Sequence, residues 1–236
     1  QGERLNILVA TSGDTGSAAM QDPEALRKIY PAMKGASEFF VDVLVEDPKS
    51  KMLVTPVSNS PENAFKLADG KTAHTCMGPT IDQQIVRDLF ANTAAAARTL
   101  SVDPDFAKLL DEKRAKLAPT KVGKHGQVME WLEDYDEVEP QHRHVSQLYG
   151  LYPSSQINPW GTPELAQAAK VTLERRGDAG TGWSMAWKAA MWARLGSIDA
   201  LFERVWTVVI DPSRSTASHR WAKRHLEAMV DGGESS

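Results

Sequence analysis

The chain has 236 residues, of which 42% are hydrophobic and 25% charged, and its formal net charge is −4 at pH 7. These values are typical of a globular protein with one large domain or two small ones, and without a basic stripe they argue against nucleic acid as a partner. Cys76 is the only cysteine, which excludes an internal disulfide, and no apolar run reaches the roughly 18 residues expected of a membrane span.

Residues 5–20 begin with a short apolar strand, followed by a loop of Gly, Ser and Thr and the start of a helix. Such an arrangement can cradle a phosphate on free backbone N–H groups. The string ATSGDTGSAA at 10–19 resembles the cofactor-phosphate loop of threonine synthase, a pyridoxal-phosphate enzyme. Beyond Met20, however, the sequence has neither βα alternation nor a Schiff-base lysine motif. We therefore treat residues 1–21 as a segment of uncertain origin and expect no cofactor. A pyridoxal-phosphate enzyme based on Thr11 to Gly16 is the least favoured alternative function.

A helix is predicted from Asp22, because Asp22 is a good N-cap and Pro23 suits the first turn. Apolar residues then recur at three- and four-residue steps up to Leu44, which gives one buried face. Pro31 is expected to kink or interrupt this helix. The pair Asp47-Pro48 is expected to end it.

Further helices are predicted over residues 80–100, 103–117, 163–173, 183–195 and 198–205. The only strand signals lie at 7–10, 52–57 and 205–210. Successive helices joined by long loops predict an all-α fold in which neighbouring helices pair as hairpins. We place one helical domain at 22–205 and a divergent tail at 206–236.

Residues 126–153 have no sustained helical or alternating period. Six carboxylates lie between Glu130 and Glu139, and His142, Arg143 and His144 follow closely. This composition predicts a functional loop held on a helical scaffold. The alternative is a solvated acidic connector, since runs of charge are usually surface.

Glu62 is the sharpest catalytic candidate from local sequence. Pro61 fixes its own φ and biases Ser60 away from the helical region, so a rigid turn presents this carboxylate beside Asn63. A glutamate that acts as a general acid needs a raised pKa, which burial against a sugar ring would supply. The alternative is an ordinary helix start.

Several motifs in this order resemble the catalytic domain of glycoside hydrolase family 95, the inverting α-L-fucosidases and related α-L-galactosidases. The similar stretches are YPAMKGA at 30–36 with the Phe pair at 39–40, SPEN at 60–63, CMGPT at 76–80, the whole of 126–153, and ERRGDAGTGWSMAWKAAMWARLG at 174–196. The resemblance implies an (α/α)6 barrel of six helical hairpins, which this chain would contain only in part. It also implies an oligosaccharide or glycoconjugate substrate.

The same resemblance assigns roles to individual residues. The glutamate of SPEN is the family's general acid, so Glu62 takes that role. The remaining candidates are expected to bind the sugar, and they are His142, His144, Glu130, Trp131, Asn63, Thr181 and Trp183. For Trp131, and for the series Trp183, Trp187 and Trp192, packing in the core is the alternative. His142 and His144 could also be read as metal ligands, but without a completed ligand set we expect no metal.

Three departures from the family pattern qualify these expectations. The family's base is expected in an HPPFQIDGNFG-like stretch after the Trp-rich helix, and neither that stretch nor the upstream Asn-x-Asn pair is found here. Asp178 and Asp211 lie outside the base motif, so neither is assigned. Gln147 replaces the last histidine of the usual HRHVSHLYG. The alternative function is therefore a non-catalytic fragment or chimera, which could self-associate through exposed apolar helix faces. The compartment stays undetermined.

Overall fold

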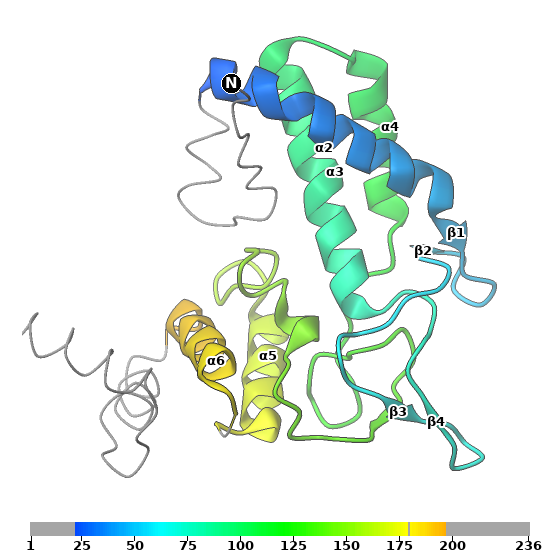
Figure 1. Ribbon diagram of the computed structural model, residues 1–236, viewed down its shortest axis with the longest axis vertical. Helices are drawn as coiled ribbons and strands as arrows, with labels where there is room; N and C mark the ends of the chain where they lie inside the picture. Colours follow the sequence, from blue (N-terminus) through cyan, green and yellow to red (C-terminus); the bar gives the residue numbers. More distant parts are fainter. Residues whose placement is uncertain (1–21, 179, 197–236) are drawn as a thin grey trace, which may run out of the picture.

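The computed structural model describes residues 22–178 and 180–196. The phosphate-type loop at 11–16, the helix at 198–205 and the strands at 7–10 and 205–210 were predicted outside this part of the chain. Figure 1 shows two groups of helices, with short strands and loops beside and below the first group. The described chain is helix-rich, with five α-helices, and none of them is long and apolar enough to cross a membrane.

Helix α2 spans Pro23–Val43 and begins as predicted, with the Asp22 carboxylate accepting the Glu24 N–H at 2.9 Å. The predicted interruption at Pro31 is wrong, because the helix continues through this residue. Proline removes the hydrogen bond to the carbonyl of Arg27. Both residues are exposed, so water can satisfy that carbonyl. The helix ends at Val43, a little earlier than Asp47.

Helices α3 (Thr80–Leu100) and α4 (Pro104–Lys116) pack with α2 into the first group, as Figure 1 shows. The turn between them begins at Ser101, which adopts a left-handed conformation with φ 55°. Polar contacts join α2 to the start of α4: the Tyr30 hydroxyl and the Lys34 ammonium both donate to Asp103, at 2.8 and 2.9 Å. The fully buried members of this core are Leu26, Val86, Phe90, Ala94, Ala96, Ala97 and Leu110.

The second group contains α5 (Pro163–Arg176), α6 (Gly182–Arg194) and the short 3₁₀ helix η1 (Ser146–Leu148). Helix α5 runs three residues beyond its predicted end at 173, to a glycine with φ 68° at 177. Trp192 is 2% exposed and Trp187 is half-buried, so both belong to the core, the alternative considered from sequence.

The described residues include five strands, each two residues long. Strand β1 (Val45–Glu46) pairs with β2 (Leu53–Val54), which is all that forms of the strand predicted at 52–57. A three-stranded sheet has the order β4-β3-β5, with β3 at Phe65–Lys66, β4 at Thr72–Ala73 and β5 at Asp136–Glu137. Its β3–β5 ladder pairs Phe65 with Glu137 and so holds the acidic stretch beside the SPEN turn.

Residues 126–153 contain no regular structure beyond β5 and η1. They are nevertheless not a solvated connector, because both flanks of the acidic run are buried. Val128, Met129, Glu130 and Trp131 are buried on one side, and Val145 to Leu148 on the other. This segment is therefore a loop fixed by the core, with its charged centre near the surface.

Candidate active site

The SPEN turn is anchored on both sides of Glu62. Ser60 is fully buried and donates to a Glu130 carboxylate oxygen at 2.8 Å. Asn63 is also buried, with its amide nitrogen 3.4 Å from the second Glu130 oxygen. A hydroxyl from η1, that of Ser146, donates to the Pro61 carbonyl. Glu62 itself remains 55% exposed, so a rigid turn presents its carboxylate at the surface.

The Glu62 carboxylate contacts the HRH segment, 142–144. The Arg143 guanidinium donates to it, and His144 Nε2 lies 3.4 Å from the same oxygen. Arg143 was not among the residues predicted for the site, although its place between two candidate histidines was a usable signal. Its carbonyl accepts the hydroxyl of Ser184 from the first turn of α6. The structure thus brings Glu62, Arg143 and His144 together across 81 residues of sequence.

His142 and His144 lie side by side, with ring centroids 5.2 Å apart. The His144 backbone N–H donates to His142 Nδ1 at 3.1 Å, which makes this nitrogen an acceptor. His142 Nε2 lies 3.9 Å from a Glu139 oxygen. Trp183 places its ring at 4.7 Å from that of His144 in an edge contact and remains 48% exposed. The exposed face of the site therefore has an aromatic wall next to an imidazole.

Burial lowers the pKa of both histidines below the ordinary value. For His142 desolvation is the largest cause and the Glu139 carboxylate opposes it; for His144 the opposing charge is Glu62. At neutral pH both rings are consequently neutral, and each can donate one hydrogen bond and accept another. That state suits binding of hydroxyl groups.

We expect the lowered histidine pKa values to make folding sensitive to mild acid. Below about pH 6.5 the unfolded chain binds protons at these residues and the folded chain binds fewer, so stability falls as the pH falls toward the folded pKa. Melting temperatures at pH 7.5 and 5.5 should therefore differ less in His142→Asn than in the wild type. His74→Asn is the control, because His74 is exposed. An unchanged pH dependence in His142→Asn would contradict this reading.

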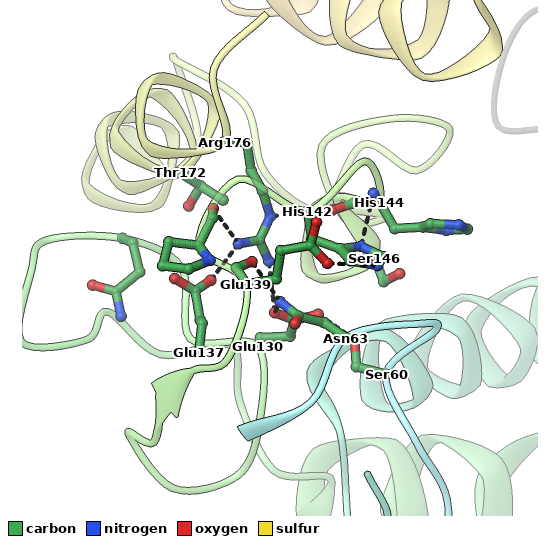
Figure 2. Close-up of polar contacts among 12 residues, drawn as sticks. Ser60, Asn63, Glu130, Glu137, Glu139, His142, His144, Ser146, Thr172 and Arg176 are labelled. Atoms are coloured by element: carbon green, nitrogen blue, oxygen red, sulfur yellow. Dashed lines mark hydrogen bonds and ion pairs between the residues drawn. The ribbon is translucent and has the colours of Figure 1, made fainter. Parts of the chain in front are cut away.

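Arg176, at the C-terminal end of α5, is the second residue that sequence reasoning missed. It is 1% exposed and donates to a Glu130 oxygen at 2.6 Å, to Glu137, and to the carbonyls of Pro140 and His144 at 2.9 and 3.1 Å. Figure 2 shows this guanidinium between the carboxylates of Glu130 and Glu137, next to the histidine segment. Burial raises the pKa of Glu130, and the charge of Arg176 opposes that shift.

The model of the glycosyl hydrolase family 95 catalytic domain matches residues 19–233. The chain belongs to this family. It is 39% identical to Alpha-L-fucosidase 2 of Arabidopsis thaliana over 196 residues. This alignment covers 81% of the present chain and 23% of the relative. It is 34% identical to Probable alpha-fucosidase A of Aspergillus niger over 193 residues, and that alignment covers 77% of the present chain and 24% of the relative. The chain thus spans about a quarter of the length of these relatives.

The remaining residues that the family 95 resemblance suggested occupy two different environments. Trp131 is 2% exposed and packs its ring at 5.2 Å from that of Phe65, in the core beneath the site. Glu130 and Asn63 are also buried, and their hydrogen bonds in the described chain are with protein groups. Thr181, at the start of α6, is exposed and lies two residues before Trp183. Of these five residues, Thr181 and Trp183 are exposed and open to a ligand, and the other three are buried.

Gln147, where the family 95 pattern usually has histidine, is buried in η1. Its carbonyl accepts the Gln84 amide at 3.0 Å, while its own side-chain amide has no hydrogen-bond partner among the described residues. Within 22–178 and 180–196, no group of three or more His, Cys, Asp and Glu side chains is arranged to hold a metal ion.

Proposed function

We propose that this chain is part of a glycoside hydrolase that removes terminal α-L-fucosyl or α-L-galactosyl residues from glycans with inversion. The observation that carries the proposal is the position of Glu62. It is a surface carboxylate on a buried, anchored turn, and it lies next to Arg143 and to His144, whose ring contacts that of Trp183. Family membership adds the reaction class. On this proposal the helix pairs are part of an (α/α)6 barrel, and its loops converge at Glu62.

In the proposed reaction Glu62 gives its proton to the glycosidic oxygen as the bond to the anomeric carbon breaks. Water attacks that carbon from the opposite face and loses a proton to a base carboxylate, which we do not assign in this chain. The neutral imidazoles of His142 and His144 are suited to binding sugar hydroxyls. The Trp183 ring can cover an apolar face of the sugar, as Tyr and Trp do where one side of a contact is apolar and the other is wet.

The direct test uses the protein that contains this chain and two substrates, p-nitrophenyl α-L-fucoside and p-nitrophenyl α-L-galactoside. We expect hydrolysis, and proton NMR at early times should detect the β-anomer of the released sugar first. Initial release of the α-anomer would contradict an inverting mechanism. A folded protein that binds L-fucose but hydrolyses neither substrate would instead support the non-catalytic alternative.

A further inference from the structure

Each nitrogen of the buried Arg176 guanidinium donates at least one hydrogen bond to another protein group. Nε donates to the His144 carbonyl, one terminal nitrogen to Glu137 and the Pro140 carbonyl, and the other to Glu130. Its planar donor fork therefore has a fixed orientation, which a lysine ammonium would not reproduce. We call these five groups the Arg176 network.

The Arg176 network reaches Glu62 from two directions. On one side, Glu130 holds Ser60 at 2.8 Å and Asn63 at 3.4 Å, the residues that flank the Pro61–Glu62 pair. On the other side, the carbonyl of His144 is held at 3.1 Å, and this residue approaches the Glu62 carboxylate. A single buried side chain thus joins the turn that carries Glu62 to the segment that faces it. Figure 2 shows Arg176 with Glu130, Ser60 and Asn63 on one side and His144 on the other.

Charge balance explains how this network can be buried. Two carboxylates, Glu130 and Glu137, lie against Arg176, and Arg175 donates to Glu137 from the adjacent position at 3.2 Å. Buried ion pairs contribute little net stability compared with apolar residues of the same size, because desolvation offsets the attraction between the charges. Their directional hydrogen bonds, however, fix geometry. The network is therefore better explained by positioning than by stability.

We propose that Arg176 and Glu130 are positioning residues that set the distance and orientation between Glu62 and the HRH segment. This inference rests on the proposed function, and it changes the role expected of Glu130 from the sequence. Glu130 acts through Ser60 and Asn63 and does not touch the sugar. A displacement of about 1 Å at a reacting group can lower a rate by about 100-fold, so the network should affect kcat more than KM.

The test compares Arg176→Lys with Arg175→Lys, a matched change one residue away. Arg175 contacts Glu137 but neither Glu130 nor His144 in the hydrogen bonds of the described chain. With p-nitrophenyl α-L-fucoside we expect Arg176→Lys to lower kcat by about 10- to 100-fold, with KM changed less than threefold. Arg175→Lys should leave both constants within twofold of wild type. Thermal melts of all three proteins measure the folded fraction under assay conditions.

A second readout does not depend on turnover. The ring resonances of His142 and His144, followed by NMR over pH 5 to 8, should shift and titrate differently in Arg176→Lys and should not change in Arg175→Lys. If wild type lacks hydrolysis, the proposed function fails, and the histidine titrations still decide the positioning role. Unchanged titrations would overturn the inference. So would a fall in kcat no larger than the loss of folded protein, because that result indicates a structural role alone.

Discussion

Glu62→Gln is expected to slow hydrolysis of p-nitrophenyl α-L-fucoside by about 100- to 10,000-fold, the range that general acid catalysis contributes. Glutamine keeps the size of the side chain and an oxygen that can accept from Arg143, so the turn should keep its shape. It has no proton to transfer to the leaving oxygen. The loss should therefore appear in kcat, with the melting temperature unchanged.

The leaving group separates an acid from a residue that only binds the sugar. The dinitrophenolate group of a dinitrophenyl fucoside leaves without being protonated. Glu62→Gln should therefore hydrolyse this substrate at a rate within tenfold of wild type. Glu112→Gln on α4 is a matched control, because Glu112 is exposed to a similar extent, at 59% against 55%. Full turnover of the p-nitrophenyl substrate by Glu62→Gln would sink the assignment of the acid. An equal loss on both substrates would point to binding instead.

Phe90→Ala is expected to lower the free energy of unfolding by about 3–5 kcal/mol, the usual cost of truncating a fully buried phenylalanine. Phe90 has no exposed surface and lies in the middle of α3, where the core of α2, α3 and α4 surrounds it. Its removal leaves a cavity that three packed helices cannot close. Urea unfolding followed by circular dichroism measures the change.

Phe39→Ala supplies the comparison, since Phe39 on α2 is 59% exposed. A surface change of this kind is expected to cost no more than about 0.5 kcal/mol. A loss as large as that of Phe90→Ala would mean that a second molecule or another part of the protein covers Phe39. Light scattering then distinguishes the two, because self-association raises the measured mass with concentration.

The helices were predictable because their signals are local. Asp22 and Pro23 mark the start of α2 at the residues where the structure has it, and the apolar periodicity of 80–100 reproduces α3. The interruption expected at Pro31 does not occur, because the rule for proline inside a helix ignores whether water can reach the carbonyl that loses its hydrogen bond. The two-residue strands were missed almost entirely, since segments so short carry no period of their own.

At the site, the sequence by itself determined which residue types are present, and it also determined the family to which the chain belongs. The SPEN turn made Glu62 the candidate acid, which stays a prediction, and the structure places the HRH segment against its carboxylate. Only the tertiary structure decided that Arg143 meets Glu62, and that Arg176 joins Glu130 to His144. These pairs are separated by 81, 46 and 32 residues, and no local spacing specifies them. Contacts from α5 and α6 hold the loop in place: Thr172 accepts the Val128 N–H, and Ser184 donates to the Arg143 carbonyl.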